Sequence, residues 1–450
     1  MTKLADLRLG HAPLPPSAGG NDPAGDIAAV APPGIPSPAT EPVEGTMLLG
    51  SLGRAQRYVL KIPAAWNGKL AVCGTPATRS EYVNDGLFGD FLLARGYAYA
   101  ASNKGIPYNA VLESAAATPD RTLAYPVPFD VMDLRKLGMV CRFGALWPEP
   151  VPIASWQTDL AALVREAKAR VEEVTGEPPS RTYALGVSVG GGQVRWLLEN
   201  EPDLVDGGLE WAAVYWHPER NVLTCLPAFL RHMPDWVRSG FEDRDAHDAI
   251  VAAGFPPDRL QDHPQFRSLW NDHYANIPPF YADATVFAYA LMLDPQARSS
   301  FELPPAIPNP LVDGPGFVSN ASGLALPENR ASYVLSDEGK KTIAGFAHTG
   351  RIGKPLVGIA GSADVFITPQ CNFAGYLEAV RAAGRADRYW QYLVEGGTHV
   401  DRFVALGYGL QAQLPFAWAA FDRLVAIVED GERPPGAGTV RAVSAPAELR

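Results

Sequence analysis

The chain has 450 residues, a hydrophobic content of 47% and a formal net charge of −11. A chain of this length and composition can bury one large core or two ordinary ones. The negative charge argues against nucleic acid and anionic membrane as partners, because the summed field of the protein would repel both. We therefore expect a small neutral or apolar substrate.

The first 45 residues differ in composition from the rest. Residues 11–45 are dense in Pro, Ala and Gly and show neither helical nor strand periodicity, so we expect an extended arm over 1–45. Such an arm drapes over the surface or reaches a neighbouring subunit of a homo-oligomer. The N-terminus lacks the apolar run of a secretory signal, and no stretch approaches 18 continuous apolar residues. These features predict a cytoplasmic protein that does not bind membranes.

Short apolar strands alternate with amphipathic helices from residue 46 onward. Helices are expected at 87–95, where Gly96 follows as a C-cap signal, and at 159–174. Strands are expected at 46–49, 57–63, 69–74, 97–102, 181–187, 211–215, 355–360 and 389–394. This alternation predicts an α/β protein whose mostly parallel sheet carries helices on both faces.

Two long segments interrupt the alternation. Residues 104–157 form an insertion within the first part of the core, 46–216, and residues 217–350 separate that part from the second, 351–450. The segment 217–350 is rich in aromatic residues and proline, so we expect a large, mainly helical cap over the carboxyl edge of the sheet. Most of its rings would form the core of the cap, and some would face a pocket.

The pentapeptide Gly186-Val187-Ser188-Val189-Gly190 lies between the expected strand 181–187 and a helix over 193–200. A serine nucleophile on a sharp strand-to-helix turn needs neighbours without Cβ atoms, so that the chain can reverse and expose the hydroxyl. The pentapeptide alone is a weak signal, and the flanking elements and partner residues carry the prediction. Ser188 is the predicted nucleophile.

Serine needs a base to activate it and a carboxylate to orient that base. The strand at 355–360 leads into Asp364, and the strand at 389–394 leads into His399 through two glycines. The chain order Ser188, Asp364, His399 is the order found in α/β hydrolases. We therefore predict Asp364 as the acid and His399 as the base.

Other interpretations of these residues stay open. Asp364 could be a helix cap or a turn former, and His399 a surface histidine. Asp401 and Glu395 flank His399, but sequence neighbours rarely reach the correct ring nitrogen. Seven further histidines lack a matching context, and two of them lie at the borders of the expected cap. The seven are His11, His217, His232, His247, His263, His273 and His348, of which His217 and His348 are the border residues.

Acyl transfer also needs hydrogen-bond donors for the developing oxyanion. One would be the backbone N–H of Val189, which follows the nucleophile. The second normally comes from the loop after the third strand, at 73–76. Gly74 permits close approach and Pro76 has no N–H, so Thr75 is the better donor.

The four cysteines are widely spaced and show no Cys-x-x-Cys pair. Their spacing, together with the lack of a histidine cluster, predicts neither a zinc site nor a disulfide framework. We expect buried free thiols and no metal or cofactor. The cysteines are Cys73, Cys141, Cys225 and Cys371.

These residues resemble the α/β-hydrolase superfamily, and within it the branch of tannase and feruloyl esterase-like and 3-hydroxybutyrate oligomer hydrolase-like proteins. The resemblance covers most of 46–435 except the cap, and it implies ester hydrolysis with Ser188, Asp364 and His399 as the triad. Tannase-type members carry disulfide-linked cysteines directly before the serine and after the histidine, where this chain has Val187 and Val400. A gallate or ferulate ester is therefore not implied specifically. The matching segments are 66–70, 73–81, 94–104, 186–190, 346–354 and 395–399.

The expected function is serine hydrolysis of a carboxylic ester with a bulky apolar or aromatic substrate, through an acyl-enzyme. A lactonase that opens a cyclic ester with the same triad is the close alternative. An amidase or an acyltransferase is the second alternative, because the triad does not specify the acceptor. A retained fold with a binding role is the competing class.

Overall fold

The computed structural model describes residues 2–7, 43–52, 56–76, 81–104, 153–240, 242–256, 286, 289–290, 292–300, 331–401, 404 and 409–449. Most of the expected arm and of the insertion 104–157 lies outside the described residues. So do two long parts of the expected cap, 257–285 and 301–330.

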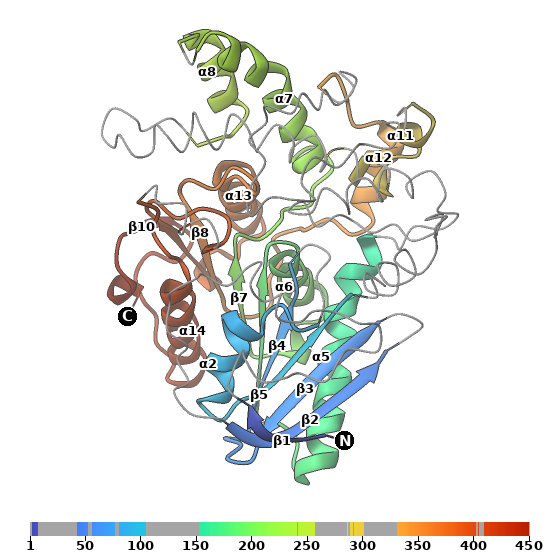
Figure 1. Cartoon of the computed structure of the whole chain (residues 1–450), viewed down its shortest axis with the longest axis vertical. Helices are drawn as coiled ribbons and strands as arrows, with labels where there is room; N and C mark the ends of the chain where they lie inside the picture. Colours follow the sequence, from blue (N-terminus) through green and yellow to red (C-terminus); the bar gives the residue numbers. More distant parts are fainter. Residues whose placement is uncertain are drawn as a thin grey trace, which may run out of the picture.

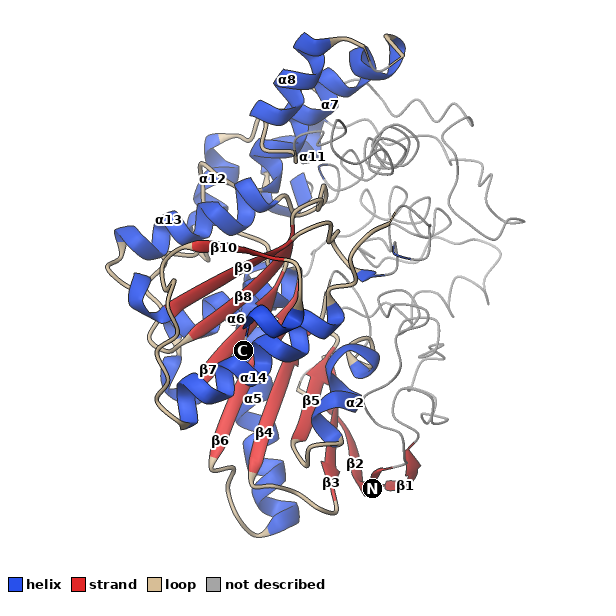
Figure 2. Ribbon diagram, turned by 90° about the vertical axis from the view of Figure 1, so that its left-hand side faces the viewer, coloured by secondary structure: helices blue, strands red, loops and turns tan. Residues whose placement is uncertain are grey.

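A ten-stranded sheet forms the centre of the molecule, in the order β1-β2-β3-β5-β4-β6-β7-β8-β9-β10 (Figures 1 and 2). From β5 to β10 all neighbours are parallel, whereas β1, β2, β3 and β5 pair antiparallel. The strands are β1 Thr2–Leu7, β2 Val43–Ser51, β3 Arg57–Pro63, β4 Lys69–Gly74, β5 Ala98–Ser102, β6 Arg181–Val187, β7 Gly207–Trp211, β8 Leu356–Gly361, β9 Tyr389–Val394 and β10 Val440–Val443.

Helices cover both faces of the sheet. Successive strand residues point to opposite sides, and here both sides are apolar. Leu70 and Val72 of β4 pack in the cluster beneath the first group of helices, and Ala71 and Cys73 pack in the cluster beneath the second. The first group is α5 (Ile153–Thr175), α6 (Val189–Asn200) and α13 (Gly375–Ala382), and the second is α2 (Asp90–Leu93) and α14 (Leu414–Glu429). This arrangement confirms the predicted α/β-hydrolase fold, with a mostly parallel sheet.

Four described helices stand between β7 and β8 in the chain, beyond the carboxyl ends of the parallel strands (Figures 1 and 2). They are α7 (Val222–Arg238), α8 (Arg244–Ala252), α11 (Pro295–Ser300) and α12 (Asp337–Ala344). Phe229 of α7 and Phe255, just after α8, stack with ring centroids 4.0 Å apart. The described part of 217–350 therefore contains helices that pack through aromatic side chains.

The structure differs from the predicted elements at several positions: α5 and α6 begin earlier than predicted, and α13 and α14 were not predicted. Three further differences concern the sheet. β7 ends at Trp211, where the prediction had a strand begin, because Ala212 adopts a φ of 45° and turns the chain out of the sheet. β1 and the start of β2 lie inside the range predicted as an arm, and they form the antiparallel edge. β10 is only four residues long, and three of them are exposed, so it carries no apolar signal.

The prediction of free thiols is wrong for two of the four cysteines. Cys225 of α7 and Cys371 form a disulfide across a separation of 146 residues. Cys371 lies in η6 (Pro369–Ala374), which follows β8. A pairing over this distance leaves no spacing pattern in the sequence, and only the fold brings the two residues together. Cys73 is a buried free thiol, as predicted, and Cys141 lies outside the described residues.

Candidate active site

Ser188 lies on the turn between β6 and α6, with φ 57° and ψ −118°. Positive φ is rare for a residue with a Cβ atom, and such conformations occur at functional sites. The turn is tight, because a Cβ on Gly186 would lie 2.2 Å from the carbonyl oxygen of Gly190. The Ser188 amide donates to the Trp211 carbonyl of β7 at 2.8 Å. The strained, anchored turn is the one that the pentapeptide predicts.

Asp364 and His399 meet at the carboxyl ends of β8 and β9, with 2.8 Å between Asp364 Oδ2 and His399 Nδ1. The other oxygen of Asp364 accepts the backbone amides of Phe366 at 2.8 Å and Ile367 at 3.0 Å. Asp364 is thus a turn former and the partner of His399 at once. Because an ionised carboxylate only accepts, His399 Nδ1 carries the proton and Nε2 is left as the acceptor.

Close backbone packing holds the loops of Asp364 and His399 together. A Cβ on Gly361 would lie 2.2 Å from the Gly397 carbonyl oxygen. The Ala363 amide also donates to the Gly397 carbonyl at 2.8 Å. The two glycines therefore bring the predicted acid and base within hydrogen-bond distance.

The two carboxylates that flank His399 have other partners. Asp401 accepts the backbone amides of Gln413 and Leu414, each at 2.7 Å, at the start of α14. Burial raises the pKa of Asp401 to about 6. Glu395 accepts a hydrogen bond from the Ser444 hydroxyl at 2.6 Å. All three residues are described, and the hydrogen bond that joins the His399 ring to a carboxylate is the one to Asp364.

The predicted oxyanion donors lie on two segments in direct backbone contact. Val189 is the first residue of α6, and Thr75 directly follows β4 and is fully buried. A Cβ on Gly190 would lie 2.1 Å from the Gly74 carbonyl oxygen. Only paired glycines allow this approach. The structure thus sets the Gly74-Thr75 segment against the turn that carries Ser188.

A buried ion pair fixes α6 on the sheet behind Ser188. The guanidinium of Arg195 in α6 donates to both oxygens of Glu210 in β7, at 2.6 and 2.7 Å. Both side chains are fully buried. Bidentate geometry is what allows such a pair to offset the loss of hydration. The sequence prediction did not identify this support.

The structure brings some of the predicted residues together and leaves one contact open. Asp364 is joined to His399, and the segment of Thr75 is packed on the turn of Ser188. Ser188 and His399 are both described, and no hydrogen bond joins their side chains in this arrangement. In enzymes without substrate, this bond is often long and shortens when substrate binds.

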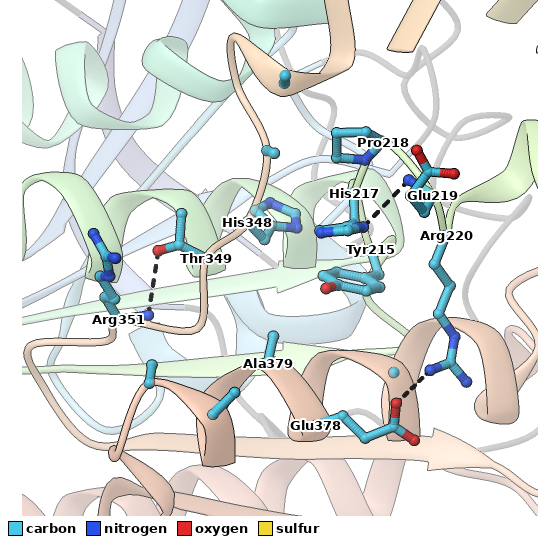
Figure 3. A pocket seen from close by; sticks show the side chains of 15 residues that line it. Tyr215, His217, Pro218, Glu219, Arg220, His348, Thr349, Arg351, Glu378 and Ala379 are labelled. Atoms are coloured by element: carbon cyan, nitrogen blue, oxygen red, sulfur yellow. Dashed lines mark hydrogen bonds and ion pairs between the residues drawn. The ribbon is translucent and has the colours of Figure 1, made fainter. Parts of the chain in front are cut away.

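His348 and His217 lie away from the predicted triad. Both residues line a cavity of about 820 Å³, and none of the five predicted site residues belongs to its lining. Figure 3 shows the two rings among the other lining side chains. His348 Nδ1 accepts the Trp216 amide at 3.2 Å, and Nε2 donates to the Gly192 carbonyl at 3.0 Å. Burial lowers the pKa of His348 to about 3. This neutral imidazole therefore supports the start of α6.

Comparison with known proteins finds similarity in structure alone. No family model and no curated protein sequence matches the chain. Feruloyl esterase B from Aspergillus oryzae is similar with a TM-score of 0.47 and 14% identity, over 89% of this chain and 84% of that one. Tannin acyl hydrolase from Aspergillus niger gives 0.44 and 14%, over 87% and 80%. Acylaminoacyl peptidase from Pyrococcus horikoshii gives 0.44 and 9%, over 90% of this chain and 44% of that one. At such identities the function has to be argued from the residues of this chain.

Proposed function

We propose that the protein is a serine hydrolase that cleaves a carboxylic ester through an acyl-enzyme intermediate. The observation that carries the proposal is the hydrogen bond between Asp364 and His399 at the carboxyl ends of β8 and β9, the same edge of the sheet at which β6 leads into the strained turn of Ser188. Ligands of open α/β sheets bind at this edge.

Each residue has one role in the proposed mechanism. His399 Nε2 takes the proton of the Ser188 hydroxyl as its oxygen attacks the ester carbonyl, and it returns the proton to the leaving alcohol. Asp364 holds the imidazole in the required tautomer and stabilises its protonated form. The amides of Val189 and Thr75 bind the oxyanion. Water, activated by His399, then releases the acid and regenerates Ser188.

The substrate we propose is bulky and apolar or aromatic. Between the end of β7 and the start of β8, Trp216 packs edge-on against Tyr289 and Phe346, with ring centroids 5.4 and 5.7 Å apart. These rings pack against one another, and the proposal rests on the wider aromatic content of the segment 217–350, since aromatic side chains over the binding edge favour large apolar groups over short acyl chains. A lactone is the close alternative, since its leaving alcohol stays attached to the acyl group. An amide substrate or acyl transfer to another acceptor is the second alternative.

Two structural features bear on the cellular compartment of the protein. None of the helices that the structure describes has both the length and the apolar character to cross a bilayer. The Cys225–Cys371 disulfide is of a kind that persists mainly in oxidising compartments. The disulfide therefore argues against the predicted cytoplasmic location. Both that location and the homo-oligomer remain predictions.

The test is hydrolysis of a panel of short-chain, long-chain and aryl esters and macrocyclic lactones by the wild type and by Ser188→Ala. We expect activity on at least one member, and its loss in the variant. The preferred member separates an esterase from a lactonase. Undiminished activity in Ser188→Ala would contradict the proposed nucleophile.

A further inference from the structure

A buried lysine contacts the segment that we propose as half of the oxyanion hole. Lys104 lies two residues after the end of β5 and is only 2% exposed. Its ammonium donates to the Thr75 carbonyl oxygen at 2.9 Å and also to the Thr75 hydroxyl. The residue adopts a φ of 59°, which is uncommon for a side chain with a Cβ atom. The backbone is thus held in an unfavourable conformation that turns the lysine toward Thr75.

Burying an ammonium is costly unless hydrogen bonds and opposite charge compensate for the lost water. Thr75 supplies two acceptors, and a nearby carboxylate belongs to the same network. The Lys104 amide donates to the Ser102 hydroxyl at 3.3 Å, and that hydroxyl donates to Asp159 of α5. Burial raises the pKa of Asp159 to about 6, while the Ser102 hydrogen bond and the Lys104 charge oppose the increase. The network therefore ties the start of α5 to Thr75.

The segment Gly74-Thr75 is held at every oxygen. The Thr75 hydroxyl donates to the Ser102 carbonyl at 2.9 Å, and its carbonyl accepts from Lys104. The Gly74 carbonyl accepts the side-chain amide of Asn84 at 3.0 Å. With Gly190 packed against Gly74, the backbone at Thr75 has little freedom to move. Preorganised donors of this kind need no rearrangement during the reaction.

We propose that Lys104 is a positioning residue that holds Thr75 against the turn of Ser188 and places a positive charge beside the oxyanion hole. This inference rests on the proposed function, because it assigns Thr75 a role in that reaction. A fixed charge in a buried site acts more strongly than one in water. Lys104 contributes mainly to the transition state, in which negative charge develops, and little to substrate binding.

The test compares Lys104→Met with Lys104→Arg on the preferred ester. In Lys104→Met we expect kcat to fall by about 10²-fold, in the range found for loss of an oxyanion-hole interaction, while KM changes less than about threefold. Lys104→Arg keeps the positive charge and the N–H donors. Its kcat should therefore be at least about tenfold higher than that of Lys104→Met. A trifluoromethyl ketone, which forms a tetrahedral adduct with Ser188, should bind about 10²-fold more weakly to Lys104→Met, and the product carboxylate about equally.

The matched control is Lys61→Met, which removes another buried ammonium. Lys61 is also 2% exposed, but it pairs with Asp85 at 2.6 Å. Its folded fraction should keep the kcat of the wild type. The inference is wrong if folded Lys104→Met keeps a kcat within about threefold of wild type, or if Lys61→Met loses as much.

A second variant covers the case in which Lys104→Met does not fold. Thr75→Val removes the hydroxyl that Lys104 and Ser102 bind but keeps the backbone amide. Its kcat should fall by about tenfold with little change in KM, and an unchanged kcat would overturn the inference. Failure of the proposed function would appear elsewhere, as a wild-type protein whose Ser188 does not react with a fluorophosphonate.

Discussion

The contact between Gly190 and Gly74 makes Gly190→Ala the substitution that most sharply tests the geometry of the site. A Cβ at Gly190 would lie 2.1 Å from the Gly74 carbonyl oxygen and 2.3 Å from its carbon, where ordinary contact begins at 3.4 Å. Both partners are backbone atoms, so no side chain can rotate away. The segment of Thr75 and the turn of Ser188 would have to separate by about 1.3 Å.

The size of that displacement sets the expected effect. A misplacement of about 1 Å can cost about 10²-fold in rate, so kcat/KM should fall by at least that factor. Overpacking of this kind typically costs about 1–3 kcal/mol of stability. We therefore expect Gly190→Ala to remain folded with a lower melting temperature and to lose most of its activity.

The assay measures ester hydrolysis and thermal unfolding of Gly190→Ala beside Gly192→Ala from the same helix. A Cβ at Gly192 would meet the Val214 carbonyl oxygen at 3.0 Å and His348 at 3.5 Å, which needs only a small shift. Gly192→Ala should keep kcat/KM within about threefold, since small local shifts are tolerated. Wild-type activity and stability in Gly190→Ala would show that the two segments are not in the contact described.

Three further predictions address the acid, the disulfide and a buried carboxylate. Asp364→Asn should lower kcat by about 10⁴-fold, because the required tautomer of the His399 ring is lost. The control Asp401→Asn should keep its activity, and equal losses in stopped ester assays would contradict the assignment of Asp364 as the acid. Replacing Cys225 and Cys371 together by serine should lower the free energy of unfolding by about 2–5 kcal/mol. Dithiothreitol should destabilise the wild type but not this variant, and equal effects of the reductant on both in calorimetry would argue against the disulfide. Burial raises the folded-state pKa of Asp401 from 3.8 to about 6, so its contribution to stability is present below pH 3.8 and lost as the pH rises through 6. Urea titrations should show a loss of up to about 3 kcal/mol in the wild type that is missing in Asp401→Asn, and parallel pH curves would refute this.

The sequence was sufficient where local chemistry dictates local structure. Gly186 and Gly190 predict the turn of Ser188, since only glycines fit it, and the order of Ser188, Asp364 and His399 along strand ends predicts their common edge. β4, β8 and β9 are confirmed within about one residue, because continuous apolar runs mark buried parallel strands. The antiparallel strand β3 is confirmed as well.

The parts that the sequence did not predict depend on contacts between distant segments. Cys225 and Cys371 can form their disulfide because the fold places α7 near η6. Nothing in the local sequence distinguishes Lys104 from the other eight lysines, and its burial against Thr75 follows from a left-handed turn after β5. The antiparallel edge formed by β1 lies in a range whose composition indicates an arm. Local periodicity contains no information on such pairings.

Ser188 as nucleophile can be tested by intact-mass and peptide analysis after incubation with a fluorophosphonate ester. We expect a single adduct on Ser188 in the wild type, strongly reduced labelling in His399→Ala, and none in Ser188→Ala. A protein that hydrolyses esters yet takes up no label, or takes it up at another serine, would contradict the proposed mechanism.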